Sequence, residues 1–244
     1  MKTDEKIVSK NYDKLANSYH NMRTKENPDG WFFNELLEMP AMLEILGNVK
    51  GKKILDFGCG TGIYAKLLTK KGAKIKGFDI SKEMIKIARE ENPSLDLKVG
   101  SGYQIPFREK FDIVMAPLVV HYLKDWDKMF KEIRRVLKDK GYFVFSTGNP
   151  VSESSEKAKR KGKKVKILTD YFTEKKVYSK CGNVKNFSYH LTYETIIKKI
   201  LKNGFEIVDY KDAFPVKKAK KLFPDYYERY SKIPFFTVWK VMKR

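Results

Sequence analysis

Apolar positions along this chain alternate between two spacings, most clearly between residues 53 and 147. Short apolar runs, which are typical of buried strands, occur at 53–57, 74–79, 95–99, 111–116 and 141–147. Between them, apolar residues recur every three or four positions, which predicts helices at 62–71, 81–91 and 126–139. Strands that alternate with helices of this length predict an α/β fold with a parallel sheet and helices on both faces.

The segments on either side of this region are less regular. Helices are predicted at 5–22 and 31–47 before it, and a helix at 192–203 with strands at 205–213 and 233–243 after it. The polar stretch 148–190 interrupts the rhythm and reads as an insertion. We therefore predict one domain, 1–244, made of four parts: an N-terminal helical cover at 1–47, a core at 48–147, the insertion at 148–190 and a C-terminal part of the sheet at 191–244.

Composition places the chain among globular proteins. It has 244 residues, of which 42% are hydrophobic and 33% charged, so it can bury a substantial core. No apolar run approaches the roughly 18 residues that a membrane span needs, and the charged N-terminus does not resemble a signal peptide. The two cysteines are Cys59 and Cys181. We expect a reduced, cytoplasmic protein that does not associate with membranes.

The net charge is +21, and most of it lies in the last part of the chain. Residues 1–150 carry a net +7 and residues 151–244 a net +14. Such an excess can attract RNA. However, only eight of the 51 basic residues are arginine, which readers of bases and phosphates favour, and lysine-rich composition has other causes. RNA therefore stays open as a partner.

Candidate chemistry begins at the sequence LDFGCGTG, residues 55–62, where an apolar run ends in three closely spaced glycines. Glycine normally weakens a strand end or a helix start, so we expect the backbone at Gly58, Gly60 and Gly62 to approach a ligand. A parallel strand that leads through glycines into a helix leaves an open crevice and free N–H groups at the helix start. These groups could bind either a pyrophosphate or an amino-acid carboxylate.

Two acids favour the second ligand. Ile63 stands where the last glycine of a dinucleotide fingerprint would fall, and Asp56 would repel a pyrophosphate but attract an ammonium group. Asp79 follows Gly58 by 21 residues, a spacing at which an acid binds the hydroxyls of a ribose. An ammonium group, a carboxylate and a ribose occur together in S-adenosylmethionine, which we therefore predict as the cofactor.

Five segments carry a resemblance to a known family. They are LDFGCGTG (55–62), GFDISKEMIKIAR (77–89), GSGYQIPF (100–107), FDIVMAPLVVHYLKDW (111–126) and FKEIRRVLKDKGYFVFS (130–146). In this order the chain resembles the class I S-adenosylmethionine-dependent methyltransferases of the type 11 group over residues 50–147. The resemblance implies a Rossmann-like, mostly parallel seven-stranded sheet whose last strand is antiparallel. It also implies N-terminal helices and an inserted acceptor cap over the site.

The resemblance also implies a set of cofactor-binding residues and no metal. The set comprises Tyr12, Tyr19, Asp56, Gly58, Cys59, Gly60, Thr61, Gly62, Asp79, Ile80, Met84, Gly100, Ser101, Gly102 and Ala116. One position departs from the family pattern. Ser101 stands where the family usually has an acid that binds the adenine amino group, and a serine hydroxyl replaces an acid only in part.

The acceptor side is less defined. His121 follows the fourth strand and His190 ends the insertion, so either could take a proton from an acceptor, although a packed histidine is the alternative at both positions. The insertion is rich in aromatic residues that we expect to line an acceptor pocket: Tyr171, Phe172, Tyr178, Phe187 and Tyr189. They favour a small acceptor of aromatic or apolar character, methylated on oxygen, nitrogen or carbon.

Three other functions stay open from the sequence alone. An RNA methyltransferase, acting on tRNA or rRNA, would use the basic C-terminal half, although no separate RNA-binding module is evident. A non-catalytic S-adenosylmethionine-binding subunit would be consistent with Ser101. A nicotinamide-dependent reductase is disfavoured by Ile63 and Asp56.

Overall fold

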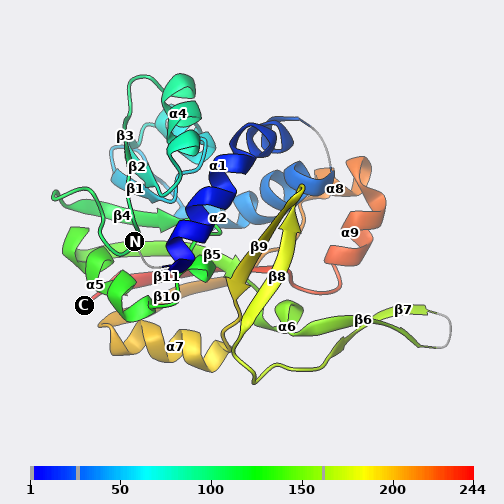
Figure 1. Ribbon diagram of the computed structural model, residues 1–244. Coiled ribbons are helices and arrows are strands. Elements are labelled where there is room, and N and C mark those ends of the chain that lie inside the picture. Colours follow the sequence, from blue (N-terminus) through cyan, green and yellow to red (C-terminus); the bar gives the residue numbers. More distant parts are fainter. Residues whose placement is uncertain (1–2, 26–27, 161–162) are drawn as a thin grey trace.

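A seven-stranded sheet forms the centre of the computed structural model, which describes residues 3–25, 28–160 and 163–244 (Figure 1). The strand order is β10-β11-β5-β4-β1-β2-β3, and β11 alone runs antiparallel to its neighbours in this sheet. The fold predicted from the sequence is therefore confirmed. These seven strands are β1 (Lys53–Phe57), β2 (Lys74–Asp79), β3 (Asp96–Val99), β4 (Phe111–Ala116), β5 (Leu137–Gly148), β10 (Phe205–Asp212) and β11 (Phe236–Lys243).

Helices cover both faces of the sheet. The α-helices described are α1 (Thr3–Thr24), α2 (Met39–Leu46), α3 (Ile63–Lys70), α4 (Lys82–Glu91), α5 (Trp126–Val136), α6 (Pro150–Glu153), α7 (Tyr193–Lys202), α8 (Lys217–Leu222) and α9 (Pro224–Tyr230). A π-helix, η1 (Pro28–Glu38), leads directly into α2, and a short 3₁₀ turn, η2 (Val120–Tyr122), follows β4. The single helix predicted at 31–47 is thus two elements, and Pro40 lies in the first turn of the second.

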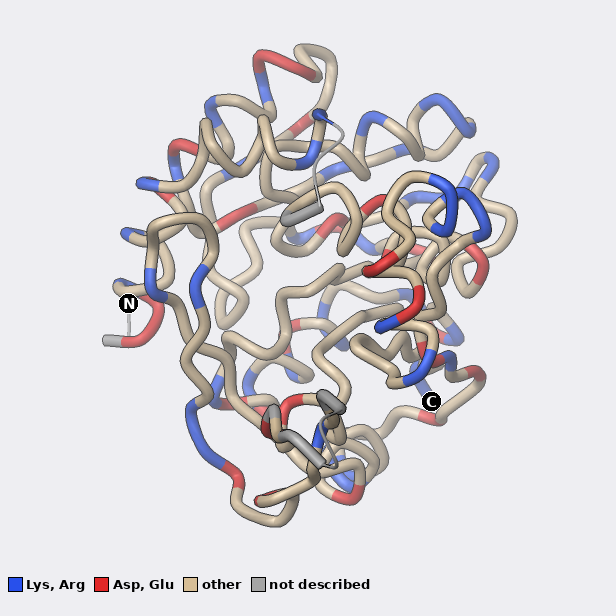
Figure 2. The backbone as a smooth tube through the Cα atoms, turned by 90° about the vertical axis from the view of Figure 1, so that its right-hand side faces the viewer, with Lys and Arg blue, Asp and Glu red and all other residues tan. Residues whose placement is uncertain are grey.

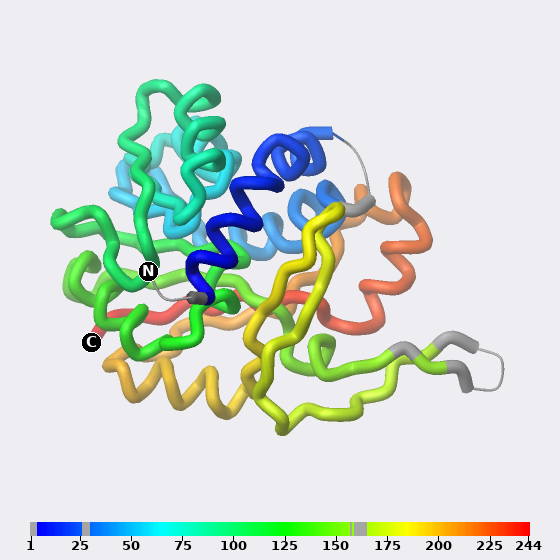
Figure 3. Tube along the Cα trace, viewed as in Figure 1, coloured from blue at the N-terminus to red at the C-terminus, as the bar shows by residue number. Residues whose placement is uncertain are grey.

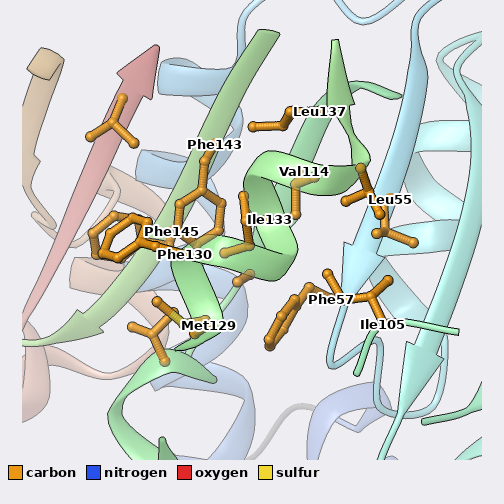
Figure 4. Packing of buried hydrophobic residues seen from close by; sticks show 14 of the residues in the cluster. Leu55, Phe57, Ile105, Val114, Met129, Phe130, Ile133, Leu137, Phe143 and Phe145 are labelled. Carbon is orange, nitrogen blue, oxygen red and sulfur yellow. The ribbon is translucent and has the colours of Figure 1, made fainter. Parts of the chain in front are cut away.

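One face of the sheet is closed by aromatic packing against α5 and α7. The stripe of apolar residues on α5, including Met129, Phe130 and Ile133, is fully buried (Figure 4). The Phe130 ring meets the Phe143 ring edge-on, with centroids 5.9 Å apart. Burying a side chain of this size contributes about 2 kcal/mol. On the other face, η1, α2, α3, α8 and α9 pack around a second cluster.

The helix predicted at 126–139 ends earlier in the structure. Helix α5 stops at Val136, and β5 begins at Leu137, opposite Phe111. The register between β4 and β5 shifts after this first pair, and Lys140 adopts a positive φ of 57°. Residues 137–139, which were predicted to extend the helix, therefore form the irregular first part of β5.

The insertion forms two separate hairpins. Strands β6 (Ser155–Arg160) and β7 (Lys163–Leu168) make one that projects from the body, and β8 (Lys176–Cys181) and β9 (Val184–Tyr189) make another that lies beside α1 (Figures 1 and 3). Asp4 of α1 accepts hydrogen bonds from Lys176, at 2.6 Å, and from the Tyr189 hydroxyl. The second hairpin therefore braces the N-terminal helix.

Charged residues are distributed rather than gathered. Figure 2 shows basic segments on several parts of one face, with acidic segments between them. Many lysines take part in ion pairs, such as Lys76 with Asp96 at 3.0 Å. Over the described part of the chain, no helix is both long enough and apolar enough to span a membrane.

Candidate functional site

A cavity opens at the carboxyl ends of the parallel strands, beneath α1, and its empty space, counted out through its open mouth, is about 720 Å³. Parallel sheets place binding crevices at this edge, because the loops that leave the strands diverge there. The cavity is lined mostly by apolar and aromatic side chains, with two acids among them. The lining residues are Glu5, Val8, Tyr12, Tyr19, Phe57, Gly58, Gly60, Phe78, Asp79, Ile80, Met84, Gly100, Gly102, Pro117, Leu118, Val119, Tyr122 and Leu123.

A smaller cavity adjoins the first, and its empty space, counted in the same way, is about 340 Å³. The two share four lining residues, which are Tyr19, Gly58, Gly60 and Pro117. The smaller cavity is more polar, since its remaining walls come from Arg23, Asp56, Cys59, Thr61, Ile63 and Tyr64. The sequence motif 55–62 therefore contributes to both spaces.

Asp56 is the most unusual group of the smaller cavity. Its side chain is 1% exposed, and neither carboxyl oxygen has a hydrogen-bond partner. Burial, aided by the nearby Asp79 carboxylate, raises the pKa of Asp56 to about 8. The buried hydroxyl of Thr61 in the same cavity also has no partner. Buried polar groups are normally paired, so these atoms indicate a site for a polar ligand.

A cation also lines this cavity. Arg23, in the last turn of α1, is 9% exposed and forms an ion pair with Glu35 at 2.7 Å. Its Nη1 also donates to the Tyr19 hydroxyl at 3.3 Å. These contacts hold the guanidinium, which stays charged at any physiological pH, at the edge of the smaller cavity.

Asp79 in the larger cavity is held very differently. One carboxyl oxygen accepts from the Gly60 N–H and the other from the Ser81 N–H, both at 2.9 Å. Burial raises the pKa of Asp79 to about 6, and these backbone donors limit the rise. The carboxylate is thus fixed in position at the end of β2 before any ligand is present.

The three glycines of the motif differ in what they allow. A side chain at Gly60 would meet nothing within 4 Å, although its φ of +53° favours glycine. At Gly58 a Cβ would lie 2.5 Å from Val119, and at Gly62 it would lie 2.5 Å from Asn92. Gly60 therefore opens onto the cavities, whereas Gly62 is needed for close packing against α4.

The loop after β4 supplies one wall of the larger cavity in a strained conformation. Leu118 has a φ of 53°, which is rare for a residue with a side chain. Its N–H donates to the Ser146 hydroxyl at 2.9 Å, and this hydroxyl donates to buried Glu38 at 2.6 Å. Tyr64 donates to the other oxygen of Glu38 at 2.7 Å. This buried chain of hydrogen bonds holds the loop in place.

Helix α1 is fastened over the cavity by polar contacts. The Ser9 hydroxyl donates to the Ile80 carbonyl at 3.1 Å, and the Ser81 hydroxyl donates to Asp13 at 2.6 Å. Further along, the Tyr12 and Tyr122 hydroxyls lie 2.8 Å apart. The helix thereby forms a roof that runs from the end of β2 to the loop after β4.

The chain is similar to known proteins over the region that holds these motifs. The profile of a methyltransferase domain family matches residues 55–145. A candidate S-adenosylmethionine-dependent methyltransferase of Listeria monocytogenes has a similar structure, with a TM-score of 0.75 and 25% identity over 85% of this chain and 96% of that one. Residues 55–145 therefore carry a class I S-adenosylmethionine-dependent methyltransferase domain.

Two relatives show how far this likeness extends. An uncharacterised protein of Haemophilus influenzae is 29% identical over 84% of this chain and 85% of its own length. The demethylmenaquinone methyltransferase of Chlorobaculum parvum is 34% identical, but over 52% of this chain and 58% of its own length. The match to a relative of named activity is thus confined to about half of each protein.

The structure brings most of the predicted cofactor residues of this methyltransferase to the two cavities. Three of them do not line either space: Gly62, Ser101 and Ala116. Ala116 is fully buried in the core, and the residues that follow it, Pro117 to Val119, form the wall instead. Ser101 contacts Glu5, which is itself a lining residue.

Neither predicted catalytic histidine lies among the described residues that line the cavities. His121 is 9% exposed and packs against the Tyr122 ring, and burial lowers the pKa of His121 to about 4. His190 lies 3.4 Å from Glu153 and 2.8 Å from the Tyr171 carbonyl. These positions favour the packed alternative for both histidines.

The aromatic residues of the insertion are also placed elsewhere. Phe172 is 86% exposed and Tyr178 is 61% exposed. None of the five predicted aromatic residues is among the described residues that line the two cavities. The aromatic wall of this methyltransferase comes from Tyr12, Tyr19 and Tyr122 instead. Sequence reasoning missed Glu5, Arg23 and Tyr122. Arg23 had one signal, because it follows Tyr19 by one helical turn.

Proposed function

We propose that the two cavities together bind S-adenosylmethionine, with the amino-acid end in the smaller one and the adenosine in the larger one. When bound, this cofactor supplies a methyl group activated by its positive sulfur. The observation that carries the proposal is the buried, unpartnered carboxyl of Asp56 beside a fixed guanidinium. A ligand with an adjacent ammonium and carboxylate would satisfy both groups.

The smaller cavity has the donor and acceptor set for an amino acid. Asp56 would receive the ammonium group and so become ionised, since an adjacent positive charge lowers a carboxyl pKa. Arg23 would face the carboxylate, and the Thr61 hydroxyl is available as a further donor. Open space at Gly60 lets the ligand backbone approach closely.

The larger cavity suits a nucleoside. Asp79 would accept from the two ribose hydroxyls, because its carboxylate is already oriented by two backbone N–H groups. Ile80 and Met84 lie beside it and offer an apolar surface for the base. Met84 is 1% exposed, so its side chain is already packed for that contact.

For the acceptor we propose a small molecule with a ring or another apolar body. Tyr12, Tyr19 and Tyr122 line the larger cavity, and no lysine of the described ranges lines either space. Such a wall favours apolar or aromatic ligands over a polyanion. The Chlorobaculum parvum relative is named for a quinone precursor, which fits this class.

The residues at this wall would align the acceptor and exclude water rather than remove a proton. Burial raises the pKa of both Tyr12 and Tyr122, so their phenols stay protonated and can donate hydrogen bonds. In-line transfer to an activated methyl depends mainly on alignment. We therefore propose an acceptor whose nucleophilic atom needs no strong protein base, such as an acidic hydroxyl or an activated carbon.

Titration calorimetry with S-adenosylhomocysteine tests the cofactor site. We expect micromolar or tighter binding by the full chain, with affinity lost in Asp56→Asn and Asp79→Asn and kept in the exposed control Asp225→Asn. Absence of binding by the unaltered protein would overturn the proposal.

Transfer of a labelled methyl group to a panel of acceptors tests the proposed acceptor class. Reduced quinones and phenolic acids should be labelled, and purified tRNA and rRNA should not. Labelling of RNA alone would show that the acceptor is wrongly assigned while the cofactor site stands.

A further inference from the structure

We propose that Glu5, at the start of α1, recognises the amino group of the adenine base, so that the roof helix rather than the sheet reads this part of the cofactor. The inference rests on the proposed function, because it assumes that the larger cavity holds the adenosine. It adds a specificity residue that lies far in sequence from the nucleoside-binding motifs.

The first support is the position of Glu5. The residue is 7% exposed and lines the larger cavity, although it belongs to the first turn of α1. The Ser101 hydroxyl, 96 positions away, donates a hydrogen bond to its Oε1. Ser101 lies between Gly100 and Gly102, which both line the cavity. The carboxylate is therefore anchored to the loop that follows β3.

This loop is itself held tightly. A Cβ at Gly100 would lie 2.7 Å from Pro106, and one at Gly102 would lie 2.5 Å from Phe57. The Ser101 oxygen also accepts from the Tyr103 N–H at 3.0 Å. With its hydrogen donated to Glu5, the serine acts as an orienting group. Glu5 then supplies the acceptor charge that position 101 lacks.

The order of acids along the site matches the order of groups in the ligand. Asp56 lies in the smaller cavity, and Asp79 and Glu5 are the two acids that line the larger one. With the ammonium on Asp56 and the ribose on Asp79, the base lies beyond the ribose, toward Ile80, Met84 and Gly100. The exocyclic amine of adenine is a donor, and a carboxylate oxygen can accept more than one hydrogen bond.

Anchoring of α1 alone does not explain a buried acid here. Ser9 and Asp13 already fasten the helix to Ile80 and Ser81. Glu5 in addition lines the larger cavity, so its carboxylate is available to a donor on the ligand.

A pair of ligands that differ in this one group tests the inference. S-adenosylhomocysteine carries the 6-amino group, and S-inosylhomocysteine carries a 6-oxo group, an acceptor. We expect the unaltered protein to prefer the adenosyl ligand by roughly 10- to 100-fold, the range for hydrogen bonds to charged groups. In Glu5→Ala this preference should fall to about threefold or less, mainly through weaker adenosyl binding.

Three further variants make the outcome decisive. Glu5→Gln keeps the shape of the side chain and should also lose the preference, because its amide can donate to the 6-oxo group. Adding Ser101→Asp to Glu5→Ala should restore it by returning a carboxylate to the loop. The exposed control Lys6→Ala, on the same helix, should change neither affinity.

Equal weakening of both ligands in the Glu5 variants would assign Glu5 a purely structural role and overturn the inference. Unchanged binding of both would overturn it as well. Failure of the unaltered protein to bind S-adenosylhomocysteine would instead reject the proposed function.

Discussion

Asp56 and Asp79 lie at the carboxyl ends of neighbouring parallel strands, yet their carboxyl groups differ in hydrogen bonding. Asp79 accepts two backbone N–H groups at 2.9 Å, whereas both oxygens of Asp56 are buried without a partner. Accordingly, the pKa of Asp79 rises to about 6 and that of Asp56 to about 8. One carboxylate is prepared by the protein, and the other is left for a ligand to complete.

The comparison shows which of the two buried acids lowers the stability of the free protein. For Asp79, two backbone donors offset part of the cost of burying the carboxylate, so the group needs little change on binding. Asp56 destabilises the free fold, because a buried acid must stay protonated or ionise without a partner. Ligand binding would remove this local destabilisation, because the ligand ammonium group would pair with the Asp56 carboxylate.

The largest effect on affinity should come from Asp79→Asn. The substitution removes the charge that two ribose hydroxyls would share, and we expect binding of S-adenosylhomocysteine to weaken by roughly 100- to 1,000-fold. The free protein should also lose about 1 kcal/mol of stability, since one backbone donor loses its acceptor. Calorimetric titration and urea denaturation measure the two effects. A free protein more stable than the unaltered one would contradict this view of Asp79.

Asp56→Asn should weaken the same ligand by roughly 10- to 100-fold, because an amide cannot pair with an ammonium charge. Its effect on the free protein should have the opposite sign. Removal of the buried acid should raise stability at pH 7 by about 2 kcal/mol. Urea denaturation measures the free energy of unfolding of both variants. A change in the same direction in both would contradict the contrast between the two acids.

Stability of the free protein should depend on pH through Asp56. Because its pKa is near 8 in the folded state and about 3.9 when unfolded, the folded state binds more protons between these values. Its contribution to stability is therefore complete at low pH and is lost as the pH rises toward 8. Denaturation midpoints of the unaltered protein, compared with those of Asp56→Asn from pH 5 to 8, measure this term. Parallel curves would contradict it.

The smallest effect is expected at His121. Removing a general base usually slows a reaction by about 100-fold or more, whereas His121→Gln should change the methyl-transfer rate by about twofold at most. The histidine is buried against Tyr122 and does not line the described cavity walls. Rate measurements under saturating cofactor test this point, and a loss of 100-fold with unchanged cofactor affinity would restore the histidine as a catalytic residue.

Local patterns were sufficient for the sheet and for the two acids. Strands β1, β2 and β4 have the boundaries that the apolar runs predict, and most of their residues are buried. Asp56 and Asp79 could be identified because Asp56 is the second-to-last residue of β1 and Asp79 ends β2, so short connections fix their spacing from the glycines.

Contacts between distant segments could not be predicted in the same way. The pairing of Glu5 with Ser101 and the place of Arg23 in the smaller cavity depend on how α1 lies over the sheet. That orientation follows from contacts with the β8–β9 hairpin and with Ser81, which no local spacing reveals. The two interpretations of each histidine could not be separated for a related reason, because sequence shows that a residue follows a strand but not which way its side chain turns.

The central claim is that a ligand ammonium completes Asp56. Titration of the protein with S-adenosylhomocysteine at pH 7, in two buffers of different ionisation enthalpy, counts the protons exchanged on binding. Asp56 is protonated in the free protein and would ionise beside the ammonium group, so we expect release of close to one proton per ligand, and none from Asp56→Asn. Binding without proton release, or equal release by both proteins, would contradict the account.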